Sequence, residues 1–538
     1  MPRADAPQTI GITRRSDTLM RQAISLRLPP VARAALHRVP GPHSTSWVLA
    51  ETAASAGFSL LSLLLIGRVI GPHEAGIGAV AIAAFLLLDV LGAAMFPDAL
   101  VQRPGLGVRH VRSALTASVL VGLAGAVVLV AAAPLAVAGT GQAALLWLML
   151  ALAPLLPLSA FSGTASGTAM REQRFRLLAL RVLLIQPVAL VAGLAAAAAG
   201  LGAWAIVANQ AVATVLVFLL FLTFGRLPLR PALDRAALGE LWPVAGPQIA
   251  AVVLMIGRYR IFLLLLGLLL AEAALAQAHF AFRLLEAALT VVRSALSRIA
   301  MPRFCALQQD RAALARSFGE ASELAPLLGL PIAIGVALVA HDLVAALLGP
   351  AWAGMGDAAR IVGLAAAVGF LHGDQFSLFV ALGRARWNMI AAVANLAVPL
   401  LALLILRPET PAGAALAWST QSLVVTPVLA AVVLRQLGRS PLWLLKRAAP
   451  GLVAGAAMVP AVLLVQEAMA EAAPLPRLLA GIAAGGVVFL TVAWLALGRR
   501  RPAMLAAQPE ARAQGAPPPE ARRPAPALAE AQIPERLG

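Results

Sequence analysis

Residues 202–224 read GAWAIVANQAVATVLVFLLFLTF. This stretch contains no charged side chain. It is also longer than the roughly 20 mostly apolar residues that a helix needs to cross the hydrocarbon core of a bilayer. Its apolar positions do not alternate with polar ones, as they would in a strand of a membrane β-barrel. The stretch therefore predicts a membrane-spanning α-helix.

Similar runs fill most of the chain. Hydrophobic residues make up 61% of the 538 positions and charged residues only 12%, against roughly 45–50% and 25% in soluble domains. We therefore expect an all-α polytopic membrane protein with about 14 transmembrane helices. Besides 202–224, the predicted spans are 46–69, 76–96, 113–134, 143–163, 177–199, 245–268, 274–300, 323–348, 358–382, 387–406, 412–435, 449–467 and 477–497.

The basic residues predict how these spans are oriented. The net charge is +18, and 34 of the 42 basic residues lie in the two tails or in loops that follow even-numbered spans. Loops after odd-numbered spans hold only four. The positive-inside rule then places both termini and the basic loops in the cytoplasm. The charge thus sets topology and contacts anionic lipids, and it gives no indication of a nucleic-acid partner.

Several function classes are excluded by what the sequence lacks. The chain has one cysteine, Cys305, so it has neither a disulfide framework nor a cysteine-based metal site. The outer loops are too short for a catalytic domain, and no nucleotide-binding motif occurs. We expect a basic cytoplasmic N-terminal tail at 1–45 and a disordered cytoplasmic C-terminal tail at 499–538. We therefore expect no enzyme, no cofactor and no metal.

The spans contain an internal repeat. Residues 169–176 read AMREQRFR and residues 381–388 read ALGRARWN, at an offset of 212. A second correspondence, at an offset of 211, joins the starts of the sixth and twelfth spans. We therefore expect an N-lobe at 46–224 (spans 1–6) and a parallel C-lobe at 245–435 (spans 7–12). A central cleft between such lobes is the usual transport site, and 449–497 adds two C-terminal helices.

The eighth span carries a polar stripe. Inserting an ionisable residue at mid-bilayer costs roughly 2.5–3.5 kcal/mol on insertion scales. Each such residue is therefore expected to have a structural or functional role. At about 100° per residue the polar side chains share one helix face, which cannot face lipid and is expected to line a cavity. Arg283 and Glu286 are spaced to pair with each other, and Glu286 could serve only that purpose. The stripe consists of His279, Arg283, Glu286, Thr290, Arg293 and Ser297.

Other polar groups within the spans are candidate substrate or coupling residues. Arg258 and Arg260 lie about 200° apart on the seventh span, so we expect one in the cleft and the other paired or extended toward the interface. The coupling candidates are Glu51, Asp89, His372 and Asp374.

Each of these candidates also has a structural alternative. Arg258 could form an ion pair with Glu51 or Asp89. His372 and Asp374 could relay protons, because histidine titrates near neutral pH, or they could simply satisfy each other in helix packing. Asn209, Gln210 and Gln421 are better explained as interhelical hydrogen bonds than as ligand contacts. An arginine-rich cavity attracts an anion, and the planar guanidinium suits a diphosphate.

Five short segments in this order resemble those of polysaccharide flippases. They are Gly67-Arg68-Val69-Ile70-Gly71-Pro72 with Gly76, Val101-Gln102-Arg103, Ala169-Met170-Arg171-Glu172-Gln173-Arg174-Phe175, Leu348-Gly349-Pro350-Ala351-Trp352, and Ala381-Leu382-Gly383-Arg384. The chain therefore resembles the Wzx-type O-antigen and exopolysaccharide flippases of the multidrug/oligosaccharidyl-lipid/polysaccharide exporter superfamily. The first segment departs from the family pattern, because His73-Glu74-Ala75 precedes Gly76 where an aromatic residue is frequent.

The resemblance implies a fold and a function. It implies two six-helix lobes plus two helices in the bacterial inner membrane. It also implies alternating-access translocation of undecaprenyl-diphosphate-linked oligosaccharide for surface polysaccharide biosynthesis, alongside the polymerase and glycosyltransferases of the same pathway. The family motifs do not mark ligand positions, so the candidate residues rest on the polar pattern alone.

Two other classes remain open from sequence. An ion-coupled multidrug antiporter of the same superfamily would require an acidic pocket in the first lobe, where Glu51 and Asp89 are the candidates. The arginines within the membrane argue against that class. A membrane-embedded glycosyltransferase or polymerase would require a large loop domain or an aspartate-rich metal motif, and the sequence has neither.

Overall fold

The computed structural model describes residues 46–384 and 386–498. All regular secondary structure in these ranges is helical, which confirms the predicted fold class. The tails predicted at 1–45 and 499–538 lie outside the described residues. The first helices are α3 (Ser46–Ala93), α4 (Pro97–Gln102), α5 (Val108–Thr140), α6 (Ala144–Leu152), α7 (Leu155–Arg171), α8 (Phe175–Ala198) and α9 (Trp204–Phe224).

The remaining helices continue without a long loop. In the middle of the chain are α10 (Arg235–Val252), the π-helical turn η1 (Val253–Gly257), α11 (Arg258–Leu266), α12 (Glu272–Ala306), α13 (Arg311–Leu347) and the 3₁₀ turn η2 (Pro350–Trp352). They are followed by α14 (Gly354–Val368), α15 (Gln375–Ala381), α16 (Arg386–Leu406), α17 (Pro411–Thr420), the π-helical turn η3 (Gln421–Val425), α18 (Thr426–Leu437), α19 (Pro441–Ala468) and α20 (Pro474–Leu497).

These helices account for all fourteen predicted spans. Within the described residues, twelve helical segments are long and apolar enough to cross a membrane. The first of them holds two predicted spans, because α3 bends at Gly71 (φ 77°), which is followed by Pro72. The predicted span 358–382 is divided between α14 and α15, with a non-helical segment at 369–374. Non-helical backbone at membrane depth is tolerated only where protein or water surrounds it.

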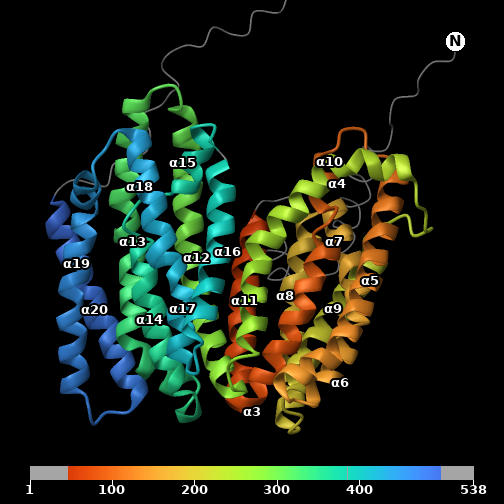
Figure 1. Ribbon diagram of the computed structural model, residues 1–538, viewed down its shortest axis with the longest axis horizontal. Coiled ribbons are helices and arrows are strands. Elements are labelled where there is room, and N and C mark those ends of the chain that lie inside the picture. Colours follow the sequence, from red (N-terminus) through yellow and green to blue (C-terminus); the bar gives the residue numbers. More distant parts are fainter. Residues whose placement is uncertain (1–45, 385, 499–538) are drawn as a thin grey trace, which may run out of the picture.

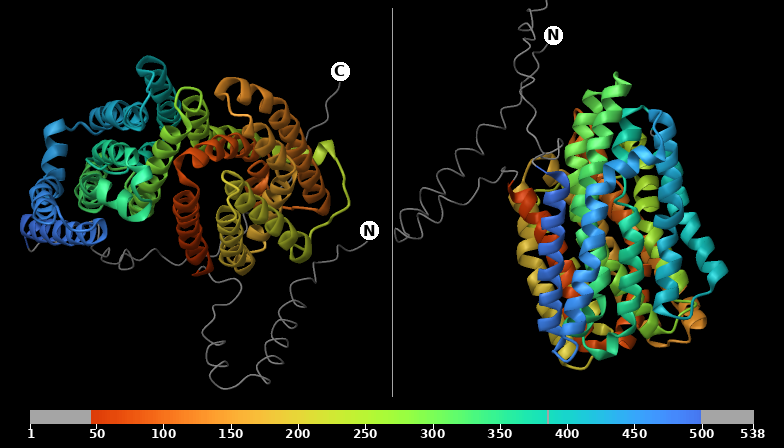
Figure 2. Two further views of the ribbon diagram at one scale, coloured as in Figure 1. Left: turned by 90° about the horizontal axis from the view of Figure 1, so that it is seen from below. Right: turned by 90° about the vertical axis from the view of Figure 1, so that its left-hand side faces the viewer.

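The helices form two bundles (Figure 1). One contains α3 to α9 and the other α12 to α20, while α10, η1 and α11 run from the first bundle toward the second (Figures 1 and 2). The bundles approach each other at one end and diverge at the other (Figure 1). The diverging end carries the loops after α4, α7, α12, α15 and α18, and we call it the arginine-rich end. The opposite end is the short-loop end.

At the short-loop end, α3 and α12 touch at glycines. A Cβ atom added to Gly76 would lie 2.0 Å from the backbone oxygen of Glu272, and one added to Gly67 would lie 2.3 Å from the ring of Phe280. Small residues allow helix backbones to approach closely inside membranes, where packing rather than hydrophobic burial drives association. The two bundles are therefore sealed against each other at this end.

Hydrogen bonds reinforce the seal. Arg68 of α3 donates from Nη1 to the carbonyl oxygen of Leu347 at 2.9 Å and to that of Ala346 at 3.3 Å. These carbonyls belong to the C-terminal turn of α13, where backbone acceptors have no partner within the helix. Gln142, in the loop between α5 and α6, donates to the Glu272 carboxylate at 2.7 Å. Polar groups from both bundles thus satisfy one another across the contact.

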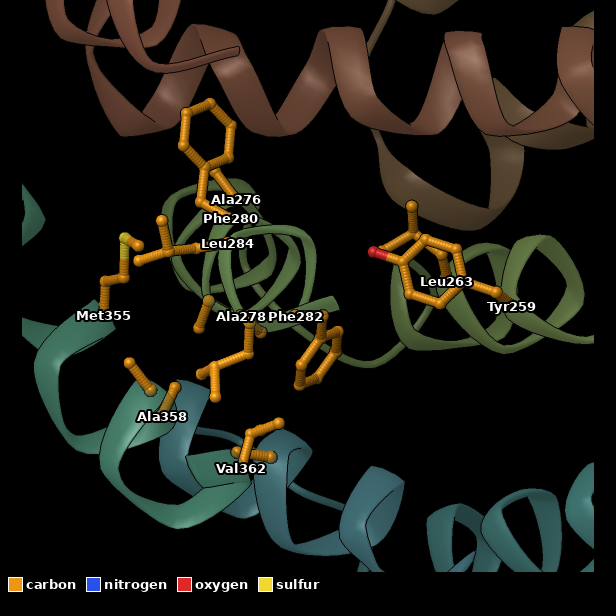
Figure 3. Packing of buried hydrophobic residues seen from close by; sticks show 14 of the residues in the cluster. Tyr259, Leu263, Ala276, Ala278, Phe280, Phe282, Leu284, Met355, Ala358 and Val362 are labelled. Carbon is orange, nitrogen blue, oxygen red and sulfur yellow. The ribbon is translucent and has the colours of Figure 1, made fainter. Parts of the chain in front are cut away.

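The largest apolar core extends from this seal into both bundles. Figure 3 shows part of it, with Phe280 and Phe282 of α12 between Met355 of α14 on one side and Tyr259 and Leu263 of α11 on the other. Phe280 also packs against Trp352, with ring centroids 4.3 Å apart. The half of α12 at the short-loop end is therefore embedded in protein, which fixes the direction in which its remaining residues point.

The two loops that suggested the repeat end with the same type of backbone turn. The amide of Arg174 bonds to the carbonyl of Ala169 at 2.9 Å, and the amide of Arg384 bonds to that of Phe379 at 2.9 Å. The residue before each arginine has a positive φ, 54° at Gln173 and 66° at Gly383. Aligned by these turns, the two loops are offset by 210 residues rather than 212. The difference arises because the side-chain alignment matched residue types, whereas the turns are matched by their hydrogen bonds. The same turn also ends α8 and α18, so the repeat itself stays a prediction.

The seal gives a first prediction. Gly76→Val places side-chain atoms where the backbone of Glu272 lies, so we expect the short-loop ends to move apart. Spin labels on Ala199→Cys and Ala353→Cys, one exposed position in a loop of each bundle, in a Cys305→Ser background should report a longer mean distance by pulsed electron resonance.

The control is Gly57→Val on the same helix, because an added Cβ there meets nothing within 4 Å. It should leave the distance unchanged. An unaltered distance in Gly76→Val itself would contradict the sealed end.

Candidate functional site

A cavity of about 680 Å³ lies between α3 and α12, the two helices that touch at the short-loop end. Most of its polar side chains come from α12, and α3 contributes hydroxyls and aliphatic groups. Clefts that bind small molecules are typically about 300–1,000 Å³. The lining residues are Thr52, Ala56, Ser59, Leu60, Leu63, Arg283, Glu286, Ala287, Thr290, Val291, Ser294, Ala295 and Arg298.

The central part of the predicted stripe lines this cavity. Arg283 donates to the Ser59 hydroxyl at 2.9 Å, which joins the two bundles, and its other terminal nitrogen lies 3.4 Å from the Glu286 carboxylate. The predicted pairing of Arg283 with Glu286 is therefore confirmed. Glu286 and Thr290 are exposed in the cavity although they lie midway along a membrane helix. Such exposure is tolerable only where water, and not lipid, fills the space.

The stripe divides toward the arginine-rich end. Arg293 stacks over the ring of Phe370 at 5.6 Å, and Ser297 donates to the carboxylate of Asp374, so both turn toward the second bundle. Ser294 and Arg298 take their places on the cavity wall. Glu286, Thr290, Ser294 and Arg298 are spaced four residues apart. Because an α-helix has 3.6 residues per turn, residues at this spacing shift gradually around the helix. Arg298 was not among the predicted cavity residues, because it lies near the predicted end of the span.

His279, at the short-loop end of the stripe, is buried. Its Nδ1 atom lies 2.6 Å from the hydroxyl of Tyr259, and the two rings are stacked. His279 therefore contacts protein on this side rather than the large cavity. Tyr259 was missed in the sequence analysis, although it is the only tyrosine in the chain and lies between two arginines within a span.

Arg258 and Arg260 lie in aromatic surroundings. Arg258 donates to the Gln421 side-chain oxygen at 2.6 Å and lies 5.6 Å from the centre of the Trp418 ring. It also lines a second cavity of about 250 Å³ between η1 and α16. Arg260 lies 5.4 Å from the ring centre of Tyr259. Arg258 follows one π-helical turn and Gln421 opens another, and such turns occur frequently at functional sites.

The coupling candidates do not meet these arginines. Glu51 accepts from Arg181 of α8 at 2.8 Å, within its own bundle. Oδ1 of Asp89 is buried and has no hydrogen-bond partner among the described residues. An ion pair of Arg258 with Glu51 or Asp89 is therefore wrong, because Gln421 occupies the position of the expected carboxylate.

His372 and Asp374 lie in the break between α14 and α15, but they are not bonded to each other. His372 donates from Nδ1 to the carbonyl of Gly373 at 2.8 Å. Asp374 caps α15 and accepts from the hydroxyls of Ser297 and Ser377. Local hydrogen bonds thus engage both side chains, and a proton relay between them stays a prediction.

A smaller, neutral polar cavity adjoins the first. It measures about 320 Å³ and shares Ser59 and Leu63 with the charged cavity. Its polar lining consists of Ser55, Ser59, Ser62, Gln186, Asn209, Gln210 and His279. The serines, spaced by four and three residues on one face of the first span, were a signal that the sequence analysis did not use. Gln210 also bonds to Thr214 of its own helix at 3.1 Å, rather than to another helix as expected.

The arginines of α11 and α12 outnumber the carboxylates close to them, so this part of the structure is positively charged. Arg258, Arg260 and Arg293 have no carboxylate within 4 Å among the described residues, and Arg283 shares Glu286 with the cavity. The described residues contain no group of three or more side chains that could hold a metal ion. An anionic group that enters the region would meet guanidinium donors in a space shielded from lipid, where such interactions are strong.

The contact between His279 and Tyr259 gives a second prediction. Tyr259→Phe removes a hydroxyl that bonds to a buried ring nitrogen, so thermal unfolding in detergent should show a loss of about 0.5–2 kcal/mol, the range measured for hydrogen bonds between membrane helices. Thr223→Val is the control, because this hydroxyl is exposed and bonds only to its own helix. An unfolding midpoint equal to that of the parent would show that the bond contributes nothing.

Comparisons with known proteins agree with this architecture. The family model described as "Polysaccharide biosynthesis protein" matches residues 65–357. The structure is similar to that of the lipid II flippase MurJ in an inward closed conformation, with a TM-score of 0.67 and 13% identity over 84% of this chain and 99% of that one. No curated protein sequence matches the chain.

A second solved structure has the same fold. It is an inward-facing multidrug resistance MATE family transporter of the MOP superfamily, with a TM-score of 0.57 and 14% identity over 71% of this chain and 94% of that one. At these identities the similarity concerns the fold. It agrees with the all-α polytopic fold that the resemblance implied.

Proposed function

Because the chain belongs to the polysaccharide biosynthesis protein family, whose model covers residues 65–357, we propose that it is a lipid-linked oligosaccharide flippase. It moves undecaprenyl-diphosphate-linked repeat units across the bacterial inner membrane during synthesis of a surface polysaccharide. The observation that carries the proposal is the cavity between α3 and α12, whose wall holds Arg283 and Arg298 at membrane depth. The pathway's polymerase and glycosyltransferases are the proposed partners.

In this proposal the arginine-rich end faces the cytoplasm, as do both termini. The lobes are the predicted ones, 46–224 and 245–435, with 449–497 as the two additional helices. The cavity wall includes Arg298 toward the arginine-rich end, whereas Gly67 and Gly76 seal the other end. This arrangement suits a state that takes up its substrate from the cytoplasm.

The chemistry of the site suits a diphosphate joined to a sugar. Arg283 offers planar, always-charged donors that match phosphate oxygens, and Glu286 holds it in position until an anion competes for the guanidinium. The neutral cavity beside Ser59 offers hydroxyl and amide groups, which can form hydrogen bonds with sugar hydroxyls. Arg258, Arg260 and Arg293 add positive potential around the cleft, which attracts a highly charged head group.

Translocation follows from alternating contact between the bundles. A bound diphosphate neutralises the arginines, which lowers the cost of burying them when the arginine-rich ends close. The glycine contact at the short-loop end must then open. The protein's part is to bind, shield and release the head group, and no bond in the substrate changes.

An ion-coupled antiporter is the second candidate, favoured by one observation. Oδ1 of Asp89 is buried inside the first bundle and has no hydrogen-bond partner in the described part of the chain, and a carboxylate of this kind is what a cation-coupled exporter requires. The basic cavity wall opposes this reading, because it would repel a cationic drug. Proton-dependent efflux of cationic dyes by the purified protein would favour the antiporter.

The flippase proposal gives a third prediction. Arg283→Ala and Arg258→Ala each remove a guanidinium from the cleft, and a hydrogen bond to a charged group is worth about 1.5–3 kcal/mol. We therefore expect each variant to lower surface polysaccharide by about tenfold or more in cells that lack the parent gene, while the amount of membrane-inserted protein stays the same.

Arg235→Ala serves as the control, because this arginine is exposed and lies at the start of α10, away from the cavity. It should retain full export. Normal surface polysaccharide in Arg283→Ala would eliminate the cavity between α3 and α12 as the site, and the same result in Arg258→Ala would eliminate a role for the second cavity.

A further inference from the structure

The repeated loops differ in what their arginines contact. In the first bundle, Arg174 donates to the carbonyl of Phe224 at 2.6 Å and to that of Gly225 at 3.2 Å, at the C-terminus of α9. Arg384 occupies the equivalent loop position in the second bundle and has the same backbone hydrogen bond. Its guanidinium makes no hydrogen bond to any described residue. Among the described residues, the Arg384 guanidinium therefore has no internal acceptor comparable to those of Arg174.

A pocket occupies the position of the missing contact. It measures about 410 Å³ and is lined by Arg311, Leu382, Arg384, Trp387, Val432, Arg435 and Gln436. The arginines come from the N-terminus of α13, the loop after α15 and the last turn of α18. No carboxylate lines the pocket, and none lies within 4 Å of the three guanidinium groups in the described part of the chain. Three like charges around one concavity repel each other unless an anion joins them.

A further observation indicates that the pocket takes an acceptor ligand. The indole Nε1 of Trp387 is a buried donor that has no hydrogen-bond partner among the described residues. A buried polar atom without a partner is costly and requires an explanation.

From this arrangement we propose that the pocket binds the phosphate group of an anionic phospholipid. Arginine forks match phosphate oxygens, the Trp387 indole supplies a donor, and Leu382 and Val432 give the wall an apolar part suited to the start of an acyl chain. The pocket lies at the arginine-rich end, at the helix ends where aromatic and basic side chains meet the interface of a membrane. A lipid is preferred to a free phosphate because the apolar wall has no role for a soluble ion.

The site is separate from the cavity between α3 and α12, because the two share no lining residue. It is nevertheless adjacent to the second cavity, since Trp387 stacks on Phe379 and Phe379 lines that cavity together with Arg258. A lipid held here would brace α15, α16 and α18 against one another at the end where the bundles diverge.

Native mass spectrometry of the full-length protein in detergent tests the proposal, with phosphatidylglycerol as the probe and phosphatidylcholine as the zwitterionic comparison. The parent should retain phosphatidylglycerol in preference. The triple variant Arg311→Gln, Arg384→Gln and Arg435→Gln should lower its affinity at least tenfold, and Arg384→Gln alone should lower it measurably. These arginines are exposed, so the variants should fold, and an unchanged unfolding midpoint checks this.

The matched control removes three exposed arginines from the same end of the first bundle, Arg176→Gln, Arg230→Gln and Arg235→Gln. It should leave phosphatidylglycerol binding intact. Equal losses in control and pocket variants would overturn the proposal in favour of unspecific charge attraction. Inorganic phosphate that displaces the lipid at comparable concentrations would overturn the assignment to a lipid.

Discussion

The structure depends on one constraint, which is that the charges of α12 cannot face lipid. Arg283, Glu286, Arg293 and Arg298 lie within or at the end of a helix long enough to cross the membrane, and each would cost roughly 2.5–3.5 kcal/mol in hydrocarbon. Two bundles solve this problem together. One face of α12 packs into the apolar core with Phe280 and Leu284, and the other lines a cavity whose opposite wall is α3. The position of α12 between the bundles is therefore a consequence of its own sequence.

The same pair of helices also connects the site to its conformational change. Near the short-loop end, Gly67 and Gly76 bring α3 against α12, and farther along the helices Ser59 and Arg283 bond across the cavity. An anion that displaces Ser59 or Glu286 from Arg283 therefore acts on a hydrogen bond that joins the two cavity walls. Binding energy can bias the two bundles only through such differences between states.

Most of the features that the sequence predicted follow from local periodicity. Apolar length predicted the fourteen spans, and the 3.6-residue period predicted that Arg283, Glu286 and Thr290 line a cavity. Two causes limited the rest. The prediction assumed that the polar stripe keeps one direction along the whole helix. It therefore included Arg293 and Ser297, whose side chains point toward the second bundle instead. The partner of Arg258 lies 163 residues away at Gln421, behind two π-helical turns that change the register, and no local pattern encodes such a contact. The serines of α3 were visible at helical spacing, but the residues that Tyr259 and Arg384 contact depend on tertiary packing.

The central claim is that a diphosphate head group occupies the cavity between α3 and α12. The most direct test places one cysteine at Thr290, which is exposed in that cavity, in a Cys305→Ser background. It then measures the rate of modification by a charged thiol reagent. A short-chain polyprenyl diphosphate should slow the reaction in proportion to its occupancy, whereas the corresponding polyprenol, which lacks the diphosphate, should leave the rate unchanged. Equal rates with and without the diphosphate lipid, at concentrations that saturate the protein, would contradict the claim.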